Sequence, residues 1–213
     1  MAERGAFLAV QYDDQGQQRE AYNLGMWIFI ATEIMLFGAL FLTYTVCRLT
    51  YHATFAAAGR HLDVPLGGLN TAILLGSSLT MALAVHAASA GGRHRRLVGY
   101  LLATIGLGLI FLIIKGLEYS REYAEGLIPW HNFAWDGADP PRAQLFFIFY
   151  FLLTGLHALH LLIGIVIVAG TAFLARRGRF PPENDTPIDM VGLYWHLIDI
   201  VWIFIFPALY LLH

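Results

Sequence analysis

The sequence predicts an all-α integral membrane protein, a bundle of five transmembrane helices. Of its 213 residues, 58% are hydrophobic and only 13% are charged, whereas soluble domains have about 45–50% apolar and about 25% charged residues. The apolar residues also fall in runs of about twenty or more, and such a run crosses about 30 Å of hydrocarbon as a helix. A soluble core needs neither that composition nor runs of that length.

Each crossing segment must be helical, because lipid cannot satisfy free backbone N–H and C=O groups. A polar tail over residues 1–23 precedes a transmembrane domain over residues 24–213. The first apolar run is too long for the core of a signal peptide, so we expect it to be retained. The fourth run is longer than a crossing requires, and we expect it to tilt or to project from the bilayer. The five predicted spans are Leu24–Val46, Gly67–Ala88, Leu97–Gly116, Gln144–Ala175 and Met190–Leu212.

The composition also excludes two classes of function. Cys47 is the single cysteine, which excludes an internal disulfide and any site with several thiolate ligands. The net charge is −2 and no basic cluster is interleaved with aromatic residues, so nothing indicates a nucleic-acid partner.

The arginines predict an orientation. Of the 13 Lys and Arg residues, eight fall on the side of the N-terminus and five on the other side. Because cytoplasmic loops carry the excess of positive charge, we expect the N-terminus in the cytoplasm and the C-terminus outside. Arg176, Arg177 and Arg179 follow the long fourth span and precede Pro181. We expect these three arginines to bind anionic lipid headgroups.

Ionisable residues inside the spans are the most informative, because each costs roughly 2.5–3.5 kcal/mol in mid-membrane. Glu33 lies about 13 Å into the first span by helical rise, with no basic residue near it in the sequence. Two interpretations stay open. The carboxyl group is either a hydrogen-bond donor that locks two helices together or a group that handles protons.

His157 and His160 are three residues apart on the fourth span, and hence on one helix face. This spacing suits two metal ligands, but a metal site needs further ligands. The chain has no HExxH or CxxC motif and no further histidine cluster in its spans. The sequence therefore favours two histidines that make polar contacts with neighbouring helices or with a lipid headgroup.

The fifth span opens with a second polar group. His196 and Asp199 share a helix face, so we expect the two side chains to pair. Asp199 is about as deep as Glu33 from the same side, which makes one shared polar patch a hypothesis. Trp195 is expected to pack or to anchor the helix at the interface.

A further polar group closes the third span. Lys115, Glu118, Tyr119 and Glu122 follow helical spacing near its outer end. This pattern predicts an ion pair at the membrane interface.

Several segments, in order, resemble motifs of cytochrome c oxidase subunit III. The fourth and fifth spans carry the most specific ones, which are similar to the family's TGxHGLH and YWHFVDxVW. The first span is similar to its GMWxFIxSE helix. Together the segments cover almost the whole chain: Gly25–Glu33, Pro65–Leu66, Leu69–Thr71, Glu118–Tyr119, Thr154–His160 and Tyr194–Trp202.

The resemblance implies a subunit without metal that binds the catalytic subunit I, whose haems and copper reduce oxygen to water while protons are pumped. It also implies other oxidase subunits as partners, bound phospholipid, support of proton uptake and a place in a bacterial inner (plasma) membrane. Glu33 stands where the family has its carbodiimide-reactive carboxyl group. Across the chain we expect buried carboxyls at Glu33 and Asp199, and polar helix contacts at Asn70, Glu118, His157, His160, Trp195 and His196.

One departure from the family matters. The mitochondrial form has seven helices, and its first two, which stand across a lipid cleft from the others, are not expected here. Five-helix forms occur in bacterial cytochrome c oxidases, in quinol oxidases and in nitric oxide reductase clusters. The motifs leave the electron donor open between cytochrome c and quinol, although glutamate at position 33 favours cytochrome c.

Two other classes of protein fit less well. A small proton channel or transporter built around Glu33 and Asp199 would have helices broken at mid-span, but the spans are uninterrupted apart from Pro207. A membrane metalloenzyme would use His157 and His160, and metal analysis of the isolated chain distinguishes it.

Overall fold

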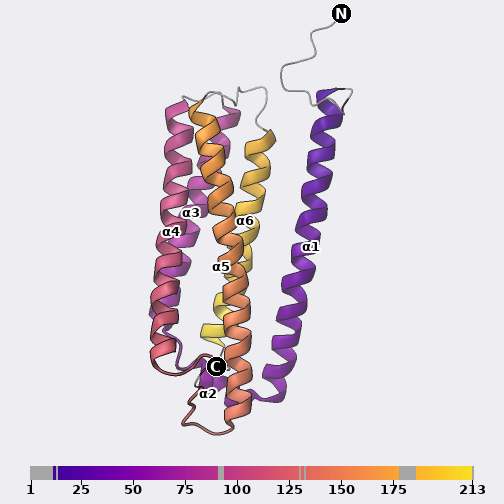
Figure 1. Cartoon of the computed structure of the whole chain (residues 1–213). Coiled ribbons are helices and arrows are strands. Elements are labelled where there is room, and N and C mark those ends of the chain that lie inside the picture. The colour runs from indigo at the N-terminus through magenta and orange to yellow at the C-terminus, as the bar shows by residue number, and fades with distance from the viewer. Residues whose placement is uncertain are drawn as a thin grey trace, which may run out of the picture.

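The computed structural model describes residues 12, 14–90, 94–129, 131, 133–177 and 186–212, and these residues contain helices and no strand. Five helices are long and apolar enough to cross a membrane, the last of them continuing into a π-helical turn. This confirms the predicted all-α fold with five spans. In chain order the elements are α1 (Gln15–Thr50), α2 (His52–Gly59), α3 (Val64–Ser89), α4 (His94–Ala124), α5 (Pro140–Arg176), α6 (Thr186–Phe206) and η2 (Pro207–Leu211) (Figure 1).

The core is a four-helix bundle of α3, α4, α5 and α6. Helix α3 packs against α4 and α6, and α5 packs against the same two helices from the other side. Trp195 and Trp202 of α6 are fully buried in the interior. Helix α1 stands to one side of this bundle and contacts mainly α6 and α5 (Figure 1).

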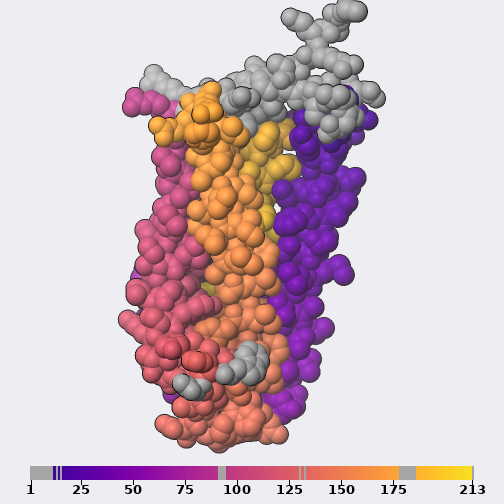
Figure 2. Space-filling model, viewed as in Figure 1, coloured from indigo at the N-terminus to yellow at the C-terminus, as the bar shows by residue number. Residues whose placement is uncertain are grey.

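Two apolar grooves flank α1. The larger, about 690 Å³, lies between α1 and α6 and includes Trp27, Phe41 and Ile200 in its lining. The smaller, about 380 Å³, lies between α1, α5 and α6. In the space-filling view α6 is visible between α1 and α5 toward the end where α6 begins (Figure 2). Helix α1 is therefore attached to the bundle along a narrow seam.

The helices extend beyond the predicted spans. Helix α1 begins at Gln15 instead of Leu24, where the Asp14 side chain accepts a hydrogen bond from the Gln17 amide at 2.7 Å. Such a side chain satisfies one of the free N–H groups at a helix start. Helix α5 has 37 residues, about 55 Å by helical rise, so it projects beyond the hydrocarbon. Hydropathy marks only the apolar middle of each helix, and capping decides its ends.

The C-terminal turn packs back against the bundle. Pro207 ends α6, because proline cannot donate a backbone hydrogen bond, and the chain continues as η2. The Tyr44 hydroxyl donates to the Ala208 carbonyl oxygen at 2.8 Å. Gly67 of α3 lies so close to η2 that a Cβ atom there would be 3.1 Å from the Tyr210 ring. This close approach directs Tyr210 into the bundle, where it is fully buried.

Candidate functional site

Glu33 finds its partner on α5. Its Oε2 atom lies 3.1 Å from Nε2 of His160, and the two side chains are 13% and 16% exposed. The partner comes from a helix far along the chain, which is why the sequence around Glu33 contains no sign of it. The contact closes the seam between α1 and the four-helix bundle near mid-span.

The second ring nitrogen of His160 is bound within its own helix. Nδ1 lies 2.8 Å from the carbonyl oxygen of Leu156, and a carbonyl oxygen can only accept, so Nδ1 carries a hydrogen. Nε2 is left to face the carboxyl group of Glu33. Among the described residues the Oε2 atom makes no hydrogen bond, and its contact with Nε2 is an ion pair only when the imidazole is protonated.

A small cavity lies beside this pair. Its volume is about 10 Å³, and its lining includes Glu33, His160 and His157 together with Phe37 and Tyr194. This is close to the smallest volume that admits one water molecule. The cavity thus connects the Glu33–His160 pair with the second histidine of α5.

His157 itself lies in an apolar setting. It is 1% exposed, and its ring centroid lies 5.5 Å from that of Phe111 and 5.0 Å from that of Trp202. Within the described part of the chain neither ring nitrogen has a hydrogen-bond partner. Where the sequence predicts a polar helix contact at His157, the described residues show ring contacts, because α4 and α6 cover that face of α5. The ranges that the structure describes contain no cluster of three or more His, Cys, Asp or Glu side chains that would hold a metal ion.

The polar group on α6 faces α3. The His196 Nδ1 atom lies 2.8 Å from the Ser78 hydroxyl, and the Trp195 indole donates to the Ser77 hydroxyl at 3.1 Å. The predicted pairing of His196 with Asp199 is thus wrong, because α6 packs on α3 and His196 reaches a serine across the interface. Asp199 is buried beside Ser78, and neither of its carboxylate oxygens meets a hydrogen-bond partner among the described residues.

The hypothesis of one patch shared by Glu33 and Asp199 is also corrected. Glu33 pairs with α5, whereas Asp199 lies beside α3. Each carboxyl group belongs to a separate helix interface.

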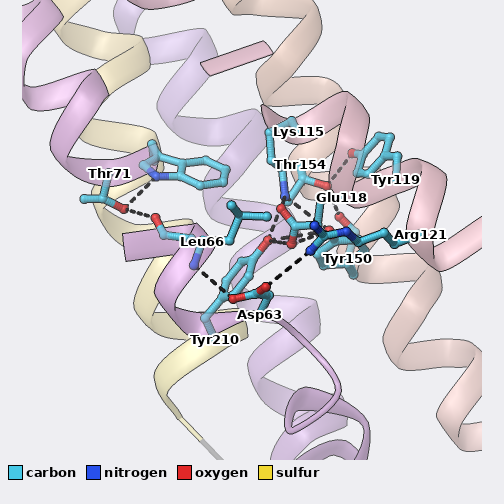
Figure 3. A network of polar contacts seen from close by, with 12 residues as sticks. Asp63, Leu66, Thr71, Lys115, Glu118, Tyr119, Arg121, Tyr150, Thr154 and Tyr210 are labelled. Carbon is cyan, nitrogen blue, oxygen red and sulfur yellow. Dashed lines mark hydrogen bonds and ion pairs between the residues drawn. The ribbon is translucent and has the colours of Figure 1, made fainter. Parts of the chain in front are cut away.

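Lys115 and Glu118 form an ion pair inside the bundle, with Nζ 3.0 Å from Oε2 and side chains 4% and 5% exposed. The predicted ion pair therefore exists but is buried, because α5 and η2 cover this face of α4. The other two donors of the ammonium group bind the hydroxyls of Tyr210 at 2.7 Å and Tyr150 at 3.2 Å. Both hydroxyls donate in turn to Oε1 of Glu118 (Figure 3). All three ammonium hydrogens are thus used.

Tyr150 and Tyr210 were missed by reasoning from the sequence. The available signal was Lys115, the one lysine of the chain, placed within an apolar run. Such a charge needs partners from other helices, and tyrosines are suitable because an apolar ring carries a polar end.

Two further buried polar groups have atoms without partners. Glu122 is 6% exposed, and its Oε2 atom has no hydrogen-bond partner among the described residues. Asn70 is fully buried, and the same holds for both polar atoms of its side chain. The described part of the chain offers Asn70 no polar helix contact, although the sequence predicts one.

The arginines predicted to bind lipid headgroups are placed in part. Arg176 ends α5, and Arg177 follows it with its guanidinium 4.2 Å from the centroid of the Phe173 ring. Arg179 lies outside the described residues.

Comparison with known proteins gives one family. The family model for cytochrome c oxidase subunit III matches residues 9–213. "Probable quinol oxidase subunit 3" of Staphylococcus aureus (strain USA300) is 29% identical over 202 residues, which cover 94% of this chain and 93% of that protein. "Quinol oxidase subunit 3" of Bacillus subtilis (strain 168) is 32% identical over 189 residues, which cover 89% of this chain and 86% of that protein.

These matches extend over almost the whole chain and confirm the resemblance carried by the sequence motifs. The described residues contain the five membrane-spanning helices that the sequence predicts. The chain belongs to the cytochrome c oxidase subunit III family, the subunit III family of the haem–copper oxidases.

Proposed function

We propose that this chain is the metal-free subunit III of a haem–copper terminal oxidase in an aerobic respiratory chain. In this role it binds the catalytic subunit I, binds membrane lipid, stabilises the complex and supports proton uptake. Haem and copper belong to the partner, where oxygen is reduced to water. The observation that carries the proposal is the contact between the Glu33 carboxyl group and the His160 imidazole at a helix interface of a subunit III chain.

The geometry of the pair suits proton exchange in a membrane. A carboxylate alone in hydrocarbon is costly, but here an imidazole nitrogen lies 3.1 Å away and can take or return the proton. Both side chains keep a small exposed fraction. Transfer of a proton from the carboxyl group to this nitrogen would leave a carboxylate beside an imidazolium, so neither charge would stand alone.

The test is Glu33→Gln in the assembled oxidase. Glutamine keeps the shape and a hydrogen-bonding group but cannot take or release a proton. We expect intact assembly and a modest fall in turnover or proton pumping, largest at high pH, where protons are scarce. The fall stays well short of the roughly 10²–10⁴-fold effect of a group that transfers protons directly in the chemical step.

Tyr44→Phe is the matched control, because it removes another polar contact of α1 without removing a proton-exchanging group. It should leave the pH dependence of turnover unchanged. Complete loss of activity in an assembled Glu33→Gln oxidase with intact metal centres would contradict the proposal and make Glu33 a catalytic group.

The donor of electrons to this oxidase is proposed to be cytochrome c, which the glutamate at position 33 favours. Quinol is the second candidate, because two relatives at 29% and 32% identity are named quinol oxidase subunits. The assembled complex, supplied separately with reduced cytochrome c and with a quinol, decides between them.

Two other parts of the proposal are testable on the chain itself. The purified chain should contain no stoichiometric haem or copper, and metal analysis measures this directly. The excess of arginine on one side supports an N-terminus in the bacterial cytoplasm and a C-terminus outside. Labelling from outside intact cells of a cysteine introduced at position 177 would contradict this orientation.

A further inference from the structure

A groove with two arginines lies at the end of the bundle where α4 begins and α5 ends. It has a volume of about 500 Å³ and is lined by Arg95, Val98, Gly99, Leu102 and Arg176. Volumes of about 300–1,000 Å³ are typical of ligand sites. One end of the lining is therefore cationic and the rest is apolar.

The two arginines lie at one level of the membrane. Arg95 opens one candidate span and Arg176 closes another, so both guanidinium groups fall where apolar helix gives way to headgroups. Val98, Gly99 and Leu102 follow Arg95 along α4, towards the middle of the membrane. The charge thus sits at the headgroup end of the groove, and its apolar part extends into the hydrocarbon.

Neither arginine has an ion-pair or ring partner within the described ranges. Three other arginines do have one: Arg121 pairs with Asp63, Arg142 pairs with Asp139, and Arg177 stacks on Phe173. Arg95 and Arg176 are exposed, and no ion pair to a described acidic residue involves them. Two guanidinium groups from different helices can bind one phosphate, each with up to two parallel hydrogen bonds.

Gly99 leaves the middle of the groove open. A Cβ atom built there would meet nothing within 4 Å. A larger side chain at this position therefore fits the fold and fills only the groove. Gly99 lies one helical turn from Arg95, so an acyl chain that descends from a phosphate at Arg95 passes over it.

We infer that this groove binds one anionic phospholipid, with its phosphate between Arg95 and Arg176 and an acyl chain along Val98, Gly99 and Leu102. The complementary charge selects an anionic headgroup, and the apolar part requires an attached chain. The site differs from the apolar grooves beside α1, which contain no arginine in their linings. The inference rests on the lipid binding that the proposed function includes and names one site for it. Its failure would remove this site alone, whereas failure of the oxidase role would appear in the Glu33→Gln test.

The test measures how much phosphatidylglycerol the full-length chain retains after extraction from vesicles of phosphatidylcholine and phosphatidylglycerol. Native mass spectrometry should show one tightly retained phosphatidylglycerol per chain. Arg95→Gln or Arg176→Gln should weaken its retention about tenfold, the effect of one lost charge-assisted hydrogen bond of roughly 1.4 kcal/mol. Phosphatidylcholine and inorganic phosphate should not replace it, because each lacks one of the two features that the groove recognises.

The matched controls separate a site from general surface charge. Arg96→Gln removes the same charge from the neighbouring exposed position of α4, which does not line the groove. This variant should retain the lipid. Gly99→Leu should expel the lipid while both arginines remain, and circular dichroism should show an unchanged melting curve.

Three results would overturn the inference. Equal losses in Arg95→Gln and Arg96→Gln would show that only surface charge attracts the lipid. Retention of the lipid in Gly99→Leu would show that the acyl chain lies elsewhere. Loss of another subunit from the assembled complex of Gly99→Leu, with no change in retained lipid, would assign the groove to a protein partner.

Discussion

Lys115 is a charged residue in the interior of a membrane bundle, and the bundle tolerates its charge because neighbouring side chains bind it. Its ammonium group binds Glu118, Tyr150 and Tyr210, and its Nζ atom lies 5.4 Å from the centroid of the Trp202 ring. Removing one member of a buried ion pair leaves the other charge without compensation. The cost of doing so is typically about 3–5 kcal/mol.

We therefore expect Lys115→Met to lower the free energy of unfolding by about 3–5 kcal/mol. Unfolding of the purified chain in detergent, followed by circular dichroism, measures this. The double variant Lys115→Met/Glu118→Gln should recover a large part of the loss, because the carboxylate has gone as well. Arg142→Met, which breaks the more exposed pair with Asp139, should cost less than about 1 kcal/mol. A double variant as unstable as Lys115→Met alone would show that the ion pair is not the source of the loss.

At the scale of elements, the contact between α3 and η2 depends on the absence of a side chain. A Cβ atom at Gly67 would lie 2.9 Å from the Phe206 ring and 3.1 Å from the Tyr210 ring. Tyr210 also binds Lys115 and Glu118. A side chain at position 67 that displaces the Tyr210 ring therefore disturbs the buried ion pair as well.

Gly67→Ala should therefore destabilise the chain by about 1–3 kcal/mol, the usual cost of overpacking. Gly38→Ala is the matched control, because a Cβ atom at Gly38 meets nothing within 4 Å and alanine favours a helix by up to about 1 kcal/mol over glycine. Thermal unfolding of the two variants in the same detergent compares them. Equal stability of both would contradict the close approach of α3 and η2.

The helices also show what the sequence could and could not predict. Continuous apolar runs predicted all five spans, because a membrane imposes both their length and their helical form. They did not predict α2, a helix of eight residues, or the π-helical turn after Pro207. Glu33, His160, Lys115 and Glu118 were identified as conspicuous polar residues, since charge is rare in hydrocarbon.

The partners of those residues were largely not predicted. Helical spacing relates residues of one helix, and so it suggested that His196 pairs with Asp199. The hydrogen bond of His196 instead crosses to Ser78 on α3. Which helices lie side by side depends on the packing of the whole bundle, and no local sequence pattern predicts that packing.

For the whole molecule, the uneven packing predicts uneven stability. Helix α1 is the least buried of the five spans, with 6% of its apolar window buried against 44% in the last span. Regions with few buried contacts open at lower free energy than the core. In detergent, amides in the apolar middle of α1 should exchange hydrogen faster than those of α5, as mass spectrometry of peptides from the two helices would show. Uniform protection of α1 and α5 would contradict this order.

The long sequence separation between Glu33 and His160 has a consequence for biosynthesis. Helix α1 leaves the ribosome and enters the bilayer first, and α5 follows only after α2, α3 and α4. At about 5–20 residues per second, the nascent α1 spends on the order of ten seconds in lipid before its partner exists. During that interval the Glu33 carboxyl group has no imidazole beside it, although a polar group in hydrocarbon is costly. Insertion of α1 therefore precedes its docking. Only when α5 has been inserted can Glu33 contact His160 and α1 pack against the bundle.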